Sequence, residues 1–252
     1  MQLLYKLDWE QAAGHYRAWW AGEALGRCAL AVTAPRADAP PQPPPEPPDP
    51  ISKWTDLDYI CRTNEHRHRR TFYGGEAFPT WHGGYPGNKC MAVFLGCPIT
   101  LGPSTGWIDP ILTGPEPDHS RLALRTDGEH WRFAVELLRT AARESAGRSI
   151  PSIGAFGGSG DTLAALRGNE QLLYDMVDRP EWVRQAELWL MDLWIDIYKT
   201  FHAIIREAAG GSTCWFNLWS PGRFYAAQCD FSYMISPQMF RRLFLPAIER
   251  QG

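Results

Sequence analysis

The stretch IPSIGAFGGSGDTLAAL, residues 150–166, decides the expected fold. Its first seven residues form a short apolar run bounded by proline and glycine, which is typical of a buried β-strand. The glycines at 157, 158 and 160 suit a tight turn, and a helical pattern begins at residue 162. A strand that leads through a glycine-rich turn into a helix is the unit of a parallel α/β sheet.

The same alternation extends in both directions from this stretch. Apolar residues spaced three and four apart predict amphipathic helices, and the Ser236-Pro237 pair predicts the cap of the last one. We expect helices at 8–20, 55–70, 89–95, 132–146, 162–166, 170–177 and 178–208, and from 238 onward. We expect short strands at 72–78, 150–156 and 213–219. Residues 29–32 form a short apolar run, and we expect residues 99–107 to form an extended loop over a pocket. The order predicts the α/β class.

A proline-rich segment at residues 37–50 interrupts this pattern. Eight of the eleven residues from 40 to 50 are proline. Proline fixes φ and removes the backbone donor, so this segment predicts neither helix nor strand. We interpret it as a loop insertion in a single domain that spans residues 1–252.

Composition excludes several classes of protein. The chain has 25 Lys and Arg against 28 Asp and Glu, which argues against a protein that binds nucleic acid through its phosphates. The sequence has no run of 18 apolar residues, so we expect no membrane-spanning helix. The N-terminus lacks a signal-peptide pattern. Six scattered cysteines predict reduced thiols in a cytoplasmic protein. The 12 Trp, 9 Tyr and 11 Phe suit a pocket for a small molecule.

Few individual residues suggest chemistry by themselves. The glycines at 154–160 fit no nucleotide-binding pattern. The spacing of Cys214 and Cys229 does not decide whether they bind zinc or are buried thiols. Asp230 suits a pocket acid or a helix cap, and His82 suits a ligand contact or a surface position. Residues 65–70 (EHRHRR) predict a solvated helix face.

A set of motifs resembles a known family. Residues 230–246 read D-x5-S-P-x-x-F-x3-F-L-P, which resembles the uroporphyrinogen decarboxylase family. The stretches GEAFP (75–79), FLG (94–96), TGW (105–107), DTLAALRG (161–168) and DRPE (178–181) resemble its divergent, methyltransferase-like branch. The resemblance covers most of the chain from about Trp9.

The resemblance implies a TIM (β/α)8 barrel with its site at the C-terminal ends of the strands. The chain then corresponds to the N-terminal part of that barrel and ends about midway around it. The methyltransferases' zinc ligands, a His-x-Cys pair and a later Cys, would lie beyond residue 252. The resemblance also implies a small-molecule substrate and a corrinoid protein as a partner, and it leaves a homodimer open. The decarboxylase's arginine-rich R-Q-A-G-R signature is absent, which argues against a tetrapyrrole with four carboxylates.

Three functions remain open at this point. The first is methyl transfer between a corrinoid protein or a methylated substrate and a thiol. The second is decarboxylation of uroporphyrinogen or a related carboxylic acid, and the third is non-catalytic binding of a small ligand. We expect Asp230 as the catalytic residue because it follows a predicted strand. The expected substrate-binding residues, each at or just after a predicted strand end, are Glu76, His82, Trp107, Asn217 and Trp219.

Overall fold

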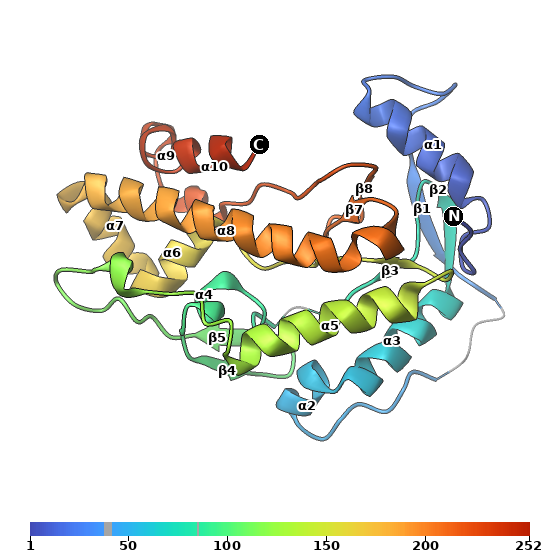
Figure 1. Cartoon of the computed structure of the whole chain (residues 1–252), viewed down its shortest axis with the longest axis horizontal. Helices are drawn as coiled ribbons and strands as arrows, with labels where there is room; N and C mark the ends of the chain where they lie inside the picture. The colour runs from blue at the N-terminus through green and yellow to red at the C-terminus, as the bar shows by residue number, and fades with distance from the viewer. Residues whose placement is uncertain (38–41, 85) are drawn as a thin grey trace. The chain divides into compact units, whose positions relative to one another are not determined.

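The computed structural model describes residues 1–37, 42–84 and 86–252. Figure 1 shows its elements in chain order. The helices are α1 (Trp9–Trp20), α2 (Pro50–Thr55), α3 (Leu57–Arg70), α4 (Met91–Phe94), α5 (Glu129–Ser145), α6 (Ser159–Arg167), α7 (Asn169–Asp178), α8 (Pro180–Ala209), α9 (Pro237–Leu243) and α10 (Leu245–Gln251), with 3-10 turns η1 (His119–Arg121) and η2 (Asp230–Met234). The strands are β1 (Ala31–Pro35), β2 (Thr71–Gly75), β3 (Thr80–Trp81), β4 (Ile99–Leu101), β5 (Gly106–Ile108), β6 (Ile150–Pro151), β7 (Ser212–Thr213) and β8 (Trp219–Ser220).

The contacts divide the chain into two compact units. The first comprises residues 1–84, 135–154 and 201–226, and the second comprises residues 85–134, 155–200 and 227–252.

Parallel pairing in the first unit joins β3 and β6, with Thr80 opposite Ile150 and Trp81 opposite Pro151. Beyond β6, the Ile153 amide donates to the Thr213 carbonyl in β7 at 3.3 Å. Helices lie between these strands in the sequence. The other strand pairs, β1–β2, β4–β5 and β7–β8, are antiparallel.

Aromatic residues form the core of the first unit. The Trp9 ring of α1 lies edge-on to Trp219, with 5.3 Å between the ring centroids, and edge-on to Phe78 at 5.4 Å. Ile150 of β6 is fully buried in the same cluster. These contacts bring α1 against the strands, because burial of such large side chains contributes about 2–3 kcal/mol each.

A buried ion pair stabilises the second unit. Arg167 at the end of α6 donates to Asp175 of α7 at 2.6 Å, and both side chains are almost completely buried. Arg167 also donates to the carbonyls of Leu112 and Gly114. The guanidinium therefore joins two helices to the 112–114 segment, and its charge is matched by a carboxylate, as burial requires.

Several expected elements are confirmed. The helix at 8–20 is α1, the helix at 132–146 is α5, and the Ser236 hydroxyl caps α9 by accepting from the Met239 amide at 3.2 Å. Two expectations are wrong. Residues 99–107 form most of the β4–β5 hairpin rather than an extended loop, and residues 213–219 contain a turn between β7 and β8 rather than one strand.

The proline-rich segment is described only in part. Residues 38–41 of the predicted 37–50 insertion lie outside the described residues. Residues 42–49 contain no helix or strand, and Pro50 begins α2, where the Asp49 side chain accepts from the Ser52 amide at 2.9 Å. Proline in the first turn is compatible with this cap because its missing N–H has no partner there.

A buried acid in the second unit predicts a pH-dependent stability. Glu187 of α8 is fully buried, and its carboxyl oxygens have no hydrogen-bond partner among the described residues. Burial, with the charge of Asp161 adding to it, raises the pKa of Glu187 from 4.5 to about 8. The native state therefore keeps a proton that the unfolded chain releases. The free energy of unfolding therefore falls as the pH rises through the window from 4.5 to about 8, by at most about 1.4 kcal/mol per pH unit.

We expect Glu187→Gln to remove this slope and to raise the melting temperature at the alkaline end of the window. The exposed Glu181→Gln on the same helix is the control, because it should leave the slope unchanged. Melting temperatures measured across the window test this. Equal pH slopes in wild-type and Glu187→Gln protein would contradict it.

Candidate functional site

A cavity of about 500 Å³ in the first unit lies among the β1–β2 pair, β3 and the turn between β7 and β8. We call it the strand-end cavity, because His82 directly follows β3 and residues 216–218 follow β7. Its apolar lining includes Phe78, Phe216 and Leu218. The polar side chains that line it are Thr33, Arg67, Thr71, Tyr73, Thr80, His82 and Asn217.

Two side chains of α3 hydrogen-bond to the backbone of β3 on the side facing away from β6. The Asn64 amide group donates to the His82 carbonyl at 2.9 Å and accepts from the His82 amide at 3.1 Å. Arg67 Nη2 donates to the Thr80 carbonyl and to Asn64 Oδ1. Asn64 thus provides the donor and acceptor that a neighbouring strand would otherwise supply.

Arg67 brings a positive charge to the strand-end cavity. Among the described residues it has no carboxylate partner. Burial lowers the pKa of its guanidinium, but an arginine side chain remains charged at neutral pH. A largely buried cation without a counter-ion is costly, so a site of this kind favours an anionic ligand.

His82 lies within hydrogen-bonding distance of Arg67. The Nη1 group of Arg67 faces His82 Nε2. Because a guanidinium can only donate, Nε2 is the acceptor in this contact. The backbone amide of Gly84 also faces the ring, with its nitrogen 3.3 Å from Nδ1. His82 therefore presents a basic nitrogen that is held by Arg67.

Asn217 reaches the cavity through an unusual backbone conformation. Its φ of 54° lies in the left-handed region, which asparagine tolerates better than most residues. The backbone N–H of Asn217 donates to the Cys214 carbonyl at 3.2 Å, which closes the turn after β7. Thr80 adds a polar group to the lining, because its hydroxyl is buried without a hydrogen-bond partner among the described residues.

The structure thus places His82 and Asn217, two of the expected substrate-binding residues, on one cavity. Sequence analysis missed Arg67, because the EHRHRR stretch predicted a solvated helix face. That expectation is wrong for Arg67 and His68. His68 is only 2% exposed, and its Nδ1 lies 3.0 Å from the Tyr73 hydroxyl. The position of Arg67 depends on its contact with β3, which no local pattern reveals.

Glu76 and Trp219 have other partners in the first unit. Glu76 is buried and accepts two hydrogen bonds from Arg27, each 2.7 Å long, as well as one from the Leu30 amide. The Arg27 guanidinium holds the pKa of Glu76 below its usual value. Trp219 is buried against Trp9 and donates to the Ala209 carbonyl at 3.0 Å. Neither residue lines the strand-end cavity.

Trp107 and Asp230 belong to the second unit. Trp107 lies on β5 and is 59% exposed. Asp230 is exposed at the start of η2 and accepts from the Gln228 side chain at 2.8 Å. Their expected roles in catalysis and substrate binding stay predictions.

All six cysteines are free thiols. Residues 1–37, 42–84 and 86–252 contain no group of three His, Cys, Asp or Glu side chains that could hold a metal ion. The part of the chain that the structure describes therefore does not itself fit a zinc site. In the same part, no helix combines the length and the hydropathy that a membrane span requires.

Comparison with known proteins gives one similarity of fold. No protein-family model and no curated protein matches the sequence. The structure is similar to a methyltransferase from Methanosarcina mazei, with a TM-score of 0.55 and 12% sequence identity. The alignment covers 81% of this chain and 55% of the methyltransferase, so the chain spans about half the length of that protein. At this identity the similarity concerns the fold.

The role of Asn64 predicts the effect of its replacement. Asn64→Leu should lower the free energy of unfolding by about 1–3 kcal/mol, because the peptide groups of His82 would lose their buried partners. Urea unfolding followed by circular dichroism measures this change. The exposed neighbour Thr63 provides the control, since Thr63→Leu should change stability by less than about 0.5 kcal/mol. Equal effects of the two substitutions would show that Asn64 does not support β3.

Proposed function

We propose that this chain forms part of a TIM-barrel methyltransferase that acts on a thiol carried by an anionic small molecule. The observation that carries the proposal is Arg67 in the strand-end cavity, beside His82 and Asn217, with no carboxylate partner among the described residues. The fold similarity to a methyltransferase supports the reaction class. Active sites of TIM barrels lie at the C-terminal ends of the strands, which is where His82 and Asn217 lie in their segments.

The cavity residues suit two parts of such a reaction. Arg67 binds the anionic group of the substrate through Nη1, and in doing so it releases His82 Nε2. The released nitrogen accepts the thiol proton, since an imidazole is basic enough to do so near neutral pH. The thiolate then attacks the methyl carbon: the S–C bond forms, and the bond to the donor breaks with its electron pair remaining on the donor.

The methyl donor in this proposal is a corrinoid protein or a methylated small molecule. In the methyltransferases that the motifs resemble, zinc stabilises the thiolate. The described residues of this chain offer no zinc site, so the proposal assigns no step to a metal ion. The roles of Arg67 and His82 do not depend on that ion.

Decarboxylation of a small carboxylic acid is the second candidate. The Arg67 guanidinium favours it as well, because Arg67 would hold the carboxylate of the substrate. A single arginine suits one carboxylate better than the four of a tetrapyrrole.

The proposal is tested by methyl transfer from methylcobalamin to two thiols that differ in charge. The purified protein should methylate 3-mercaptopropionate with a higher kcat/KM than the neutral 2-mercaptoethanol. Arg67→Gln should reduce this preference about tenfold or more, because it removes a charge-assisted hydrogen bond worth about 1.5–3 kcal/mol. Mass spectrometry of the S-methylated products measures both rates.

The neutral thiol serves as the internal control. Its rate should change much less in Arg67→Gln, which separates loss of anion binding from loss of folding. Equal preferences in the wild-type and variant proteins would overturn the role of Arg67. Release of CO2 from a carboxylic acid without any methyl transfer would instead support the second candidate.

A further inference from the structure

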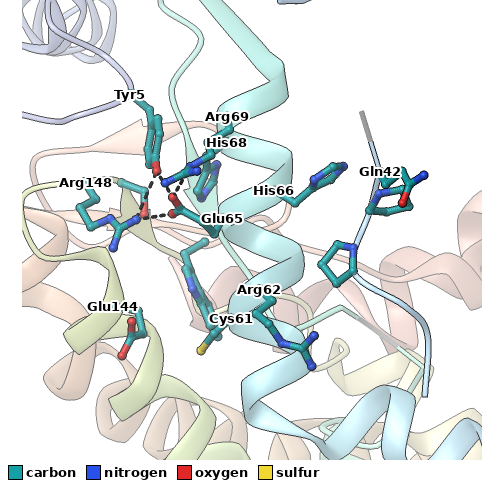
Figure 2. A pocket seen from close by; sticks show the side chains of 14 residues that line it. Tyr5, Gln42, Cys61, Arg62, Glu65, His66, His68, Arg69, Glu144 and Arg148 are labelled. Atoms are coloured by element: carbon teal, nitrogen blue, oxygen red, sulfur yellow. Dashed lines mark hydrogen bonds and ion pairs between the residues drawn. The ribbon is translucent and has the colours of Figure 1, made fainter. Parts of the chain in front are cut away.

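A second cavity of the first unit, about 590 Å³ in volume, lies on α3 away from the strand-end cavity. We call it the arginine cavity. Arg62 and Arg69 of α3 line it together with Arg148, which precedes β6. Figure 2 shows Arg69 and Arg148 near Glu65, with Gln42 of the proline-rich segment on the side of His66.

Glu65 holds two of these arginines in place. It accepts a hydrogen bond from Arg69 Nε at 2.7 Å and forms an ion pair with Arg148. The Tyr5 hydroxyl donates to the same carboxylate at 2.5 Å, and Arg148 also donates to the Tyr5 oxygen at 3.2 Å. The two guanidinium groups are therefore positioned before any ligand arrives, which reduces the entropy cost of binding.

The charges around the cavity leave an excess of one positive charge. Arg69 and Arg148 share the single carboxylate of Glu65. Arg62 is paired with Asp58 at 2.8 Å, and Glu144 is paired with Arg143 at 3.2 Å, so these residues balance each other. A cavity with two fixed guanidinium groups and one carboxylate attracts an anion.

His68 provides a second, independent observation. It lines the cavity and is 98% buried, and its Nε2 has no hydrogen-bond partner among the described residues. Burial, together with the charge of Arg67, lowers the pKa of His68 to about 3, so the ring is neutral. When Nδ1 accepts from the Tyr73 hydroxyl, Nε2 carries the proton and needs an acceptor. An unpartnered buried donor destabilises the fold, and a ligand oxygen would satisfy it.

Apolar side chains complete the walls. Trp81 of β3 is buried beneath the cavity, and Pro43 and Pro44 line it.

We propose that the arginine cavity binds an oxyanion, the carboxylate or phosphate group of a small molecule, through Arg69 and Arg148, with His68 as a further hydrogen-bonding group. This site is separate from the proposed methyl-transfer site, and its occupancy does not depend on that reaction.

Cys61 gives a local readout of occupancy. Its thiol lines the cavity, whereas Cys28 is exposed and lies outside it. We expect inorganic phosphate or succinate to slow the alkylation of Cys61 by iodoacetamide saturably, while Cys28 reacts at an unchanged rate. Peptide mass spectrometry measures both rates in one sample, and sodium chloride at equal ionic strength controls for screening.

Arg69→Gln should weaken this protection about tenfold, since it removes one charge-assisted contact. Arg70→Gln is the matched control, because Arg70 is the next residue of α3 and does not line the cavity. Protection by phosphate alone identifies a phosphate-bearing ligand, and protection by succinate alone identifies a carboxylate. No protection by either anion, or equal protection in Arg69→Gln and wild-type protein, would overturn the proposal.

Discussion

The hydrogen bonds from α3 to the free side of β3 support much of the first unit. A parallel strand has two edges, and β6 satisfies one edge of β3. Asn64 and Arg67 satisfy the other by pairing with the peptide groups of His82 and Thr80. Buried backbone groups without partners are costly, so these contacts fix the position of α3 along the strand. The position of α3 in turn sets which of its side chains reach each cavity.

Helix α3 is therefore shared by both candidate sites. Arg67 projects into the strand-end cavity, while Glu65 and Arg69 line the arginine cavity. Residues two apart on a helix do not face each other, which explains how one short stretch serves two surfaces. The 3.0 Å contact between His68 and Tyr73 joins the linings, because His68 belongs to one cavity and Tyr73 to the other.

The sequence predicted the features that depend on neighbouring residues. The periodicity of α1 and α5 and the cap at Ser236 are local signals, and all three are present. The turn within residues 213–219 was missed because alternating side chains do not distinguish one strand from two short strands that pair across a turn. The position of His82 and Asn217 after predicted strands correctly placed both near a cavity. Of the other residues chosen on the same ground, Glu76 forms an ion pair with Arg27 and Trp219 lies in the core. Arg67 depends on a contact between distant segments, so its own sequence context could not reveal it.

Arg67 uses a different nitrogen atom for each of its two roles. Nη2 donates to Asn64 and to the Thr80 carbonyl and so stabilises β3, whereas Nη1 faces His82. An anion that binds Nη1 replaces only the contact with the imidazole and leaves the contacts with β3 in place. Lysine has one ammonium group on a flexible chain and cannot reproduce both directions at once. The guanidinium thus allows ligand binding to change the hydrogen bonding of His82 without a loss of strand support, and this is the physical basis for placing an anion beside a histidine base in the strand-end cavity.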